Sequence, residues 1–344
     1  MKLVFLYLCR IFGFFYLSRI FTRNSIKVLC YHGFSFDDEH VFRPGLFITA
    51  ELLEQRMRYL SENNFNIIPL DEAVDAVTSN VVKPDSVVIT IDDGFYSVLA
   101  IAQPILKSFQ FPSTLYVTTY YVTKQFPIFR LALQYMFWKT RNETIDLEGF
   151  LGSYDLDCIA KFGQECGKSP DNLMWSLIDL AETQLVEEER QQLLSNLANI
   201  LDIDYLDICN SRKLSLIKLD ESSELINSGM DLQLHTHRHR LPLKSDEATK
   251  EVEENRQILN LMTPRKLNHF CYPSGLWDLE HWPVLRNAQI KSATTVEPGL
   301  YSQKSNVLAI PRFLDAQHIS QIEFEAEVCG FKEILRDLKR VFVK

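Results

Sequence analysis

The sequence contains no Cys-x-x-Cys pair, and its cysteines are few and scattered. There are seven in 344 residues, at positions 9, 30, 158, 166, 209, 271 and 329. An odd number of cysteines at this low density does not build the disulfide framework of a small secreted protein. We therefore expect free thiols in a protein of a reducing compartment.

The chain also lacks an uninterrupted apolar run of the roughly 20 residues needed to span a bilayer. Residues 1–24 are rich in Phe and Leu and have no acidic residue, but Arg10 interrupts them, and Lys2, Arg19 and Arg23 add positive charge. No small-residue cleavage site of a signal peptide follows. We expect a basic apolar helix that either lies on a membrane surface or packs on the folded domain. Both alternatives make the protein cytoplasmic, and the first makes it peripheral on the inner face of the membrane. An uncleaved signal anchor is the third alternative.

Basic residues are outnumbered in the chain as a whole. The formal net charge is −9, which argues against a nucleic-acid partner. No internal repeat or low-complexity segment is visible. A chain of 344 residues can bury a sizeable core, and α/β barrels of this length fold as one unit.

The first specific feature is a pair of adjacent carboxylates after an apolar run. The β-branched residues 87–91 predict a strand buried on both faces, and Asp92-Asp93-Gly94 follows them. Carboxylates this close raise each other's pKa unless a cation lies nearby. Taken alone, such a tripeptide is most often a simple turn, which Gly94 permits.

The second feature is a histidine cluster after a predicted strand over residues 230–234. Three of the eight histidines lie in residues 235–239, His-Thr-His-Arg-His. Four residues of extended chain span about 13 Å, whereas two imidazoles on one metal need Zn–N distances of about 2.0–2.1 Å. The outer two can share a metal only if the chain turns after His235, and His237 then points elsewhere. The alternative is a pair of exposed histidines on a helix.

Together, the two features predict an open catalytic metal site. Asp93, His235 and His239 supply two imidazoles and one carboxylate and leave room for water. Asp92 remains free to act as a base on that water.

A third segment, residues 270–275 (Phe-Cys-Tyr-Pro-Ser-Gly), is typical of a strand that ends in a Pro/Gly turn. With Thr90-Ile91-Asp92-Asp93-Gly94 and His-Thr-x-x-His before it, the chain resembles the polysaccharide deacetylases, which are carbohydrate esterases with a NodB-type homology domain. The resemblance covers roughly residues 26–124 and 213–335.

The resemblance implies a role for each motif residue. Asp92 is the catalytic base, Asp93, His235 and His239 hold the metal, and the backbone N–H of Ser274 helps to bind the oxyanion. Zinc suits the ligand set best, and cobalt, nickel or iron would also fit. The substrate-binding residues implied at the same rim are His32, Tyr272, Pro273, Gly275 and Arg312.

The chain departs from the family pattern in two places. Cys271 stands where the family has the arginine that orients the base. The general acid is unassigned, because Leu279-Glu280-His281 has the letters of the family's Leu-x-His motif but lies in a polar stretch just past the third motif.

Strand and helix patterns alternate along the chain, which predicts a parallel sheet with right-handed crossovers. The resemblance sharpens this to an irregular (β/α) barrel of about seven strands, with the site at the carboxyl-end rim. We expect an N-terminal helix over residues 1–25 and the barrel over 26–344. A helical insertion over about 125–212, where β-branched runs vanish, is expected above the strand ends.

The function that the resemblance implies is metal-dependent removal of N-acetyl groups from a sugar of a polysaccharide or glycolipid precursor. One alternative is hydrolysis of another C–N or ester bond on the same fold. Another is a non-catalytic glycan-binding domain, although such a domain has no need of both aspartates and both histidines. The sequence does not predict the oligomeric state.

Overall fold

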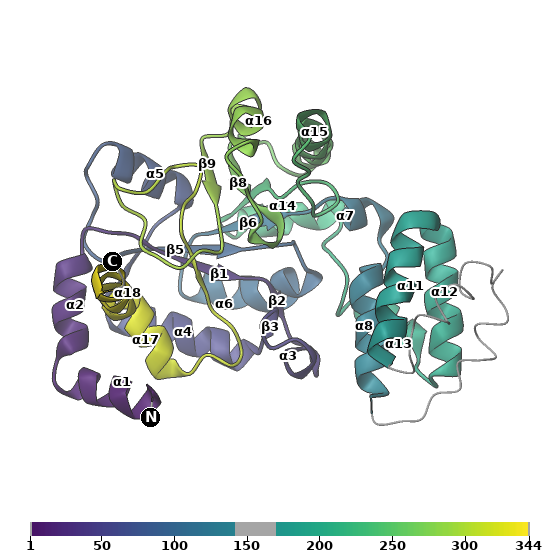
Figure 1. Cartoon of the computed structure of the whole chain (residues 1–344), viewed down its shortest axis with the longest axis horizontal. Helices are drawn as coiled ribbons and strands as arrows, with labels where there is room; N and C mark the ends of the chain where they lie inside the picture. The colour runs from purple at the N-terminus through teal and green to yellow at the C-terminus, as the bar shows by residue number, and fades with distance from the viewer. Residues whose placement is uncertain (1, 142–169, 343–344) are drawn as a thin grey trace. The chain divides into compact units, whose positions relative to one another are not determined.

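The computed structural model describes residues 2–141 and 170–342 and divides the chain into two compact units (Figure 1). The first unit joins residues 1–123 to residues 217–344, and the second spans residues 124–216.

The first unit is built on one parallel sheet of eight strands. Seven strands run in the order β10-β1-β5-β6-β7-β8-β9, and the short β4 pairs with the start of β5. The strands are β1 (Lys27–Tyr31), β4 (Asn66–Ile67), β5 (Ser86–Ile91), β6 (Ser113–Val117), β7 (Met230–Leu234), β8 (His269–Cys271), β9 (Ser292–Thr294) and β10 (Phe313–Leu314). A separate pair joins β2 (Gly33–Phe34) to β3 (Phe47–Ile48).

Helices follow the strands and cover the curled sheet, as the crossovers of a parallel sheet require (Figure 1). They are α3 (Glu39–Phe42), α4 (Ala50–Glu62), α5 (Leu70–Thr78), α6 (Gln103–Ser108), α7 (Tyr120–Lys124), α14 (Ser222–Asn227), α15 (Ser245–Met262), α16 (His281–Asn287), α17 (Gln321–Val328) and α18 (Phe331–Phe342). The irregular (β/α) barrel predicted from the sequence is confirmed, as a curled half-barrel.

The two central strands explain where the functional residues lie. Every residue of β1 and β5 is buried, and their pairing runs in step from Lys27 opposite Val87 to Tyr31 opposite Ile91. Because both strands end at the same level, the residues that follow them meet at one edge of the sheet.

A buried ion pair ties the outer helices to the sheet. Arg56 of α4 donates to Asp315 after β10 at 2.9 Å, and Tyr31 at the end of β1 donates to the same carboxylate at 3.2 Å. All three side chains are buried, and the Arg56 guanidinium also lies 4.6 Å from the centre of the Phe324 ring. Each charge therefore has a partner, which a buried charge requires.

Two helices precede the sheet, α1 (Lys2–Ile11) and α2 (Phe14–Thr22), with a bend of 78° between them. Among the described residues no single helix is long and apolar enough to cross a membrane, although this bent pair together has the length and composition. Phe15 packs on Phe331 with ring centres 5.1 Å apart.

The second unit contains only helices among its described residues: α8 (Phe129–Lys139), α11 (Pro170–Gln184), α12 (Glu187–Ile200) and α13 (Tyr205–Ser211). Helix α8 packs against α11 and α12, and Leu193, Leu194 and Leu197 are buried.

Five of the seven cysteines lie among the described residues, and all five are free thiols. Cys158 and Cys166 lie outside the described residues.

Candidate active site

The site residues follow the carboxyl ends of three strands. Asp92 and Asp93 follow β5, His235 follows β7, and Ser274 lies just after β8. Since the strands are parallel, segments more than 140 positions apart meet at one rim.

Asp93, His235 and His239 come together as the sequence predicted. Nε2 of His235 and Nε2 of His239 each lie 3.3 Å from Oδ1 of Asp93. The chain turns sharply after His235, because Thr236 (φ 64°) and His239 (φ 54°) have left-handed backbone conformations. Such backbone strain persists only where the surroundings hold it, and it often marks a functional site.

Backbone and side-chain contacts fix the His235 ring. Its Nδ1 lies 2.8 Å from the carbonyl oxygen of Cys271, which can only accept, so Nδ1 carries the proton. The other ring nitrogen, Nε2, faces Asp93. The backbone N–H of His235 donates to Oδ1 of Asn255, whose Nδ2 donates to the Val117 carbonyl. This arrangement is typical of a metal-ligating histidine.

His237 does not face this cluster. Its Nδ1 hydrogen-bonds with the Thr119 hydroxyl at 2.9 Å, and its ring packs edge-on against Tyr120. His237 therefore braces the loop that holds its two neighbours.

The three residues fit a divalent cation. One ligand atom from each lies within 4.8 Å of the others. Burial favours a protonated Asp93, but the neighbouring histidines override it and lower the pKa of this carboxyl to about 2. Partial burial lowers the pKa of His239 to about 4, so its ring is neutral and able to bind a metal above that pH.

Asp92 is held by an arginine from another part of the chain. Nη1 and Nη2 of Arg312 donate to its two carboxylate oxygens, each at 2.7 Å, and both side chains are buried. Burial alone would raise the pKa of Asp92, but the guanidinium holds it well below its usual range. Arg312 also donates to Thr90 Oγ1 and to the Thr295 carbonyl, which fixes its plane.

This contact accounts for Cys271 in the place of the family's arginine. The Cys271 thiol lies 3.3 Å from Oδ2 of Asp92 and 3.1 Å from Nη2 of Arg312. A small side chain here leaves room for the guanidinium that arrives from the segment before β10. We predicted Arg312 as a substrate contact, but its side chain is fully buried, so the geometry gives it the role of orienting Asp92.

His32 lies at the same rim, directly after β1. Its Nε2 is 3.8 Å from Oδ2 of Asp92, and its side chain is 18% exposed. It is therefore within reach of a molecule bound between Asp92 and solvent. The Cys30 thiol lies 3.5 Å from the same carboxylate oxygen.

The loop after β8 presents Ser274 to solvent. Ser274 (φ 55°) and Gly275 (φ 68°) both have left-handed backbone conformations, and Pro273 before them is buried. A Cβ on Gly275 would lie 2.1 Å from a methyl group of Val296, so no larger residue fits without moving the loop. Tyr272, predicted as a substrate contact, is buried instead and donates its hydroxyl to the Leu308 carbonyl.

His281 does not complete the site. It is the buried first residue of α16, and its Nδ1 accepts from the backbone N–H of Asp278 in the preceding turn. His318 is exposed in the turn before α17. All eight histidines lie among the described residues. His32 is the one that lies beside Asp92 without being assigned as a metal ligand.

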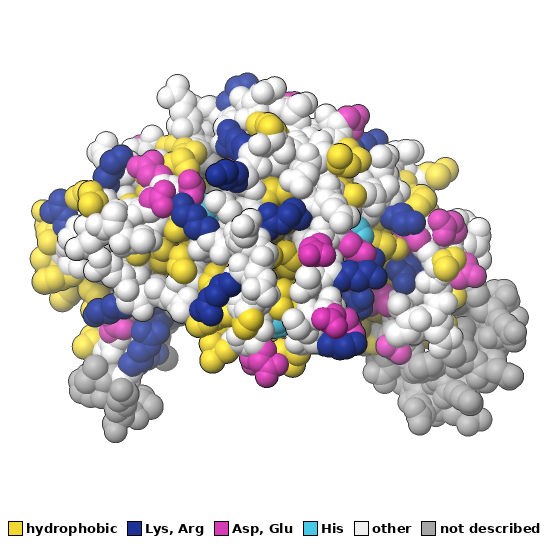
Figure 2. Space-filling view, turned by 90° about the horizontal axis from the view of Figure 1, so that it is seen from above, with side chains coloured by type: hydrophobic (Ala, Val, Ile, Leu, Met, Phe, Trp, Pro, Cys, Tyr) yellow, Lys and Arg dark blue, Asp and Glu magenta, His cyan; other side chains and the backbone are white. Residues whose placement is uncertain are grey.

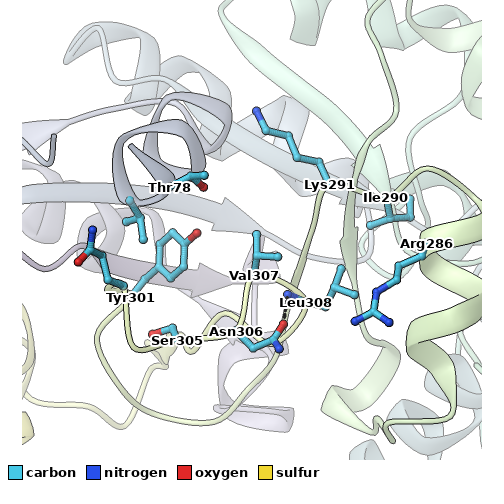
Figure 3. A pocket seen from close by; sticks show the side chains of 11 residues that line it. Thr78, Arg286, Ile290, Lys291, Tyr301, Ser305, Asn306, Val307 and Leu308 are labelled. Atoms are coloured by element: carbon cyan, nitrogen blue, oxygen red, sulfur yellow. Dashed lines mark hydrogen bonds between the residues drawn. The ribbon is translucent and has the colours of Figure 1, made fainter. Parts of the chain in front are cut away.

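A separate pocket of about 700 Å³ lies away from these residues (Figure 3). Its lining includes Thr78 at the end of α5, Arg286 of α16, Lys291 before β9 and Tyr301. Lys291 pairs with Asp71 and with Asp75. Residues before the strands line this pocket, so it is not the cleft of the carboxyl-end rim.

Comparison with known proteins agrees with the motifs. The family model described as "Polysaccharide deacetylase" matches residues 208–293, which include the histidine cluster and the loop after β8. No match was found among curated proteins.

Solved structures of deacetylases share the fold. The Streptococcus pyogenes deacetylase PplD in complex with acetate superposes with a TM-score of 0.58 at 16% identity, over 89% of this chain and 99% of that one. IcaB from Ammonifex degensii gives 0.56 at 16% identity, over 89% and 97%. A de-N-acetylase from Aggregatibacter actinomycetemcomitans gives 0.53 at 13% identity, over 87% and 98%.

Fold and site thus resemble those of the NodB-type deacetylase domains. The resemblance of this chain to the polysaccharide deacetylase family is confirmed by the family model and by the shared fold.

Proposed function

We propose that this protein is a metal-dependent hydrolase that removes N-acetyl groups from a sugar of a polysaccharide or a glycolipid precursor. The observation that carries the proposal is the meeting of Asp93, His235 and His239 beside the separate carboxylate of Asp92. A glycan-binding domain would gain nothing from burying a second acid and a matched arginine next to such a cluster.

Zinc is the metal that two imidazoles and one carboxylate suit best, with cobalt, nickel and iron as alternatives. A divalent metal held by Asp93, His235 and His239 would supply Lewis-acid chemistry, polarising the amide carbonyl and making water more acidic.

The chain's own groups would carry the rest of the reaction. Asp92, fixed by Arg312, takes the proton from the attacking water. The N–H of Ser274 donates to the oxygen on which negative charge develops. The C–O bond forms first as the carbonyl π electrons move onto that oxygen. The C–N bond then breaks as the carbonyl re-forms and the nitrogen takes up a proton, and the products are acetate and an amino sugar.

His32 is the proton donor that the geometry offers to the departing amine. It lies beside Asp92, it is partly exposed, and the described chain places no other free imidazole at the rim. Replacing His32 with Gln should lower kcat strongly and change the affinity for the metal little. A kcat equal to that of the native protein would exclude this role.

The experiment that tests the proposal measures acetate release from N-acetylated oligosaccharides with and without a chelator. Asp93→Ala and His239→Ala should lose both tight metal binding and acetate release. Asp92→Asn should keep the metal and lose turnover. His318→Gln is the matched control, because this histidine is exposed and away from the site.

Two outcomes would contradict the proposal. Acetate release that persists without any metal would exclude metal dependence. Faster release from O-acetylated than from N-acetylated glycans would favour an ester hydrolase on the same scaffold.

We also propose that the domain works in the cytoplasm. The support is the set of free thiols among the described cysteines, which a reducing compartment preserves. Cleavage of the protein by a protease added to intact cells would contradict this location.

A further inference from the structure

Helices α1 and α2 expose an unusual amount of apolar surface. In α1 the buried side chains are Leu6 and Cys9, and in α2 they are Phe15, Ser18 and Thr22. Twelve large hydrophobic side chains of the segment are between 43% and 80% exposed. They are Leu3, Val4, Phe5, Tyr7, Leu8, Ile11, Phe12, Phe14, Tyr16, Leu17, Ile20 and Phe21, and we call them the N-terminal apolar face.

The size of this face sets it apart from ordinary surface. With aromatic side chains of 150–250 Å² each, it presents on the order of 1,000 Å² to solvent. The largest apolar patch on a typical monomer is about 300–600 Å². Figure 2 shows hydrophobic side chains gathered at the end of the first unit where Figure 1 places α2. A helix that is apolar on nearly all sides belongs in a core or in lipid.

The helices form a fixed platform on the barrel. Phe5 and Phe15 pack on Phe331 of α18. At the turn between α17 and α18, Gly330 lies so close to α2 that a Cβ there would be 2.2 Å from the Thr22 hydroxyl. Phe15 and one side of Phe5 thus face inward, while the twelve side chains of the N-terminal apolar face remain 43–80% exposed.

The charges around the face suit anionic lipid headgroups. The first 24 residues carry four basic residues and no acidic one. Lys2 and Arg10 pair with Glu323 and Glu325 of α17, yet their side chains remain 72% and 53% exposed. Arg23 is exposed after α2. Basic residues that flank an apolar, aromatic helix are typical of helices that lie in the membrane interface.

We propose that the N-terminal apolar face attaches the protein peripherally to an anionic lipid surface. The bend of 78° between α1 and α2 suits two helices that lie along the surface. The face is made of convex helix surfaces with flexible side chains, which a deformable lipid layer can cover without a matching groove. This inference does not depend on the proposed activity.

The test is flotation of the full chain with vesicles on a density gradient, which separates lipid-bound protein from aggregates. The vesicles are phosphatidylcholine alone or an equal mixture with phosphatidylglycerol. The variant Ile11→Ser/Phe12→Ser/Phe21→Ser changes side chains that are 76%, 71% and 80% exposed. The matched control, Val81→Ser/Leu206→Ser/Leu261→Ser, changes side chains that are 70%, 71% and 73% exposed elsewhere.

The native protein and the control should float with the mixed vesicles, and the N-terminal variant should bind at least tenfold more weakly. Circular dichroism should show the same helix content in all three proteins, because the changed side chains are not buried. Native protein that stays at the bottom of the gradient would overturn the proposal, and so would a variant that floats as well as the control. A dimer that forms through this face and excludes vesicles, seen by ultracentrifugation, would overturn it in favour of a second copy.

Discussion

At the scale of single residues, the pair of Asp92 and Arg312 decides whether the site can exist. Two buried charges cost several kcal/mol each in desolvation, and only close, well-aligned hydrogen bonds offset this cost. The two contacts at 2.7 Å and the bonds from Arg312 to Thr90 and Thr295 meet that requirement. The same pair also keeps Asp92 ionised.

We predict that Arg312→Met destabilises the protein by about 3–5 kcal/mol, because it leaves the Asp92 charge buried without a partner. Urea unfolding measures the loss. The double variant Asp92→Asn/Arg312→Met should recover much of it, since no charge then remains. A single variant as stable as the native protein would show that Arg312 does not hold Asp92.

The same substitution should change the pH dependence of activity. Arg312 holds the pKa of Asp92 well below its usual range, so the carboxylate stays ionised in acid. Without the guanidinium, burial raises the pKa of Asp92, and the acidic limb of the kcat profile moves to higher pH. An acidic limb at the same pH in both proteins would show that ionisation of Asp92 does not set it.

Gly275→Ala should distort the loop that carries Ser274. The new methyl group would meet Val296 at 2.1 Å, and Ala disfavours the left-handed backbone at this position. We expect a loss of about 1–3 kcal/mol in unfolding free energy and a lower kcat. Gly45→Ala is the control, since a Cβ there meets nothing within 4 Å, and it should leave kcat unchanged. Equal kcat values for the two variants would contradict the role of the loop.

The residue pattern predicted part of this site. Asp93, His235 and His239 stand out because each motif lies at a strand end and the ligand types match a metal. The partner of Asp92 was not predictable, because Arg312 reaches it from a segment 220 positions away, through pairing of β10 with β1. A Pro-Arg step before a short strand was the available signal, and sequence spacing does not tell which way such an arginine points.

At the scale of elements, a buried histidine at the start of β8, His269, contacts both the start of β9 and helix α5. Nδ1 of His269 hydrogen-bonds with the Ser292 hydroxyl at 2.7 Å, and Nε2 lies 3.3 Å from a carboxylate oxygen of Asp71. Burial lowers the pKa of His269 to about 4, and Asp71 opposes this shift only in part.

This histidine should make stability depend on pH. The unfolded chain protonates His269 near pH 6.5, and the folded protein does so only near pH 4. Protonation of the unfolded chain therefore lowers the unfolding free energy as the pH falls from 6.5 to 4. Above pH 6.5 this loss is absent, and the stability that depends on a neutral His269 is fully present. The effect is about 3 kcal/mol. His269→Gln should remove about one proton from the slope of unfolding free energy in this range, whereas His318→Gln should not. An unchanged slope in His269→Gln would contradict the assignment.

The regular elements were largely predictable, and the exceptions have local causes. The apolar β-branched run of β5 and the charged amphipathic α15 match their patterns. The apolar stretch of residues 65–70 forms only the two-residue strand β4 (Asn66–Ile67), because Pro69 caps α5 and the helix begins at Leu70. The π-helical turn Val98–Ala102 before α6 has no sequence signature that periodicity would reveal.

At the scale of the whole molecule, a metal that binds only the folded state must stabilise the fold. At a free zinc concentration of about 100 times Kd, we expect a gain of about 2.7 kcal/mol in unfolding free energy. Thermal denaturation with zinc and with a chelator measures this gain. His239→Ala should lose it and His237→Gln should retain it, because His237 faces Thr119. A gain that survives in His239→Ala would place the metal elsewhere.

The fold class was predictable because strand and helix patterns alternate and the motifs occur at strand ends. The sequence alone does not decide whether the N-terminal segment lies on a membrane surface or packs on the barrel, and the structure shows the reason. The same two helices pack inward through Phe15 and carry the N-terminal apolar face outward. Because amino-acid composition counts the inward and the outward apolar side chains together, it does not distinguish the two alternatives.

The direction of β1 has a consequence for how substrate reaches the protein. Helix α2 leads into the amino end of the strand, and His32 and the aspartates lie at the other end, about 20 Å away along β5. If the domain rests on lipid through α1 and α2, its candidate active site faces water, and the sheet lies between that site and the lipid surface. It would then trim sugars that extend well clear of the bilayer, and a residue joined directly to a lipid would lie out of its reach.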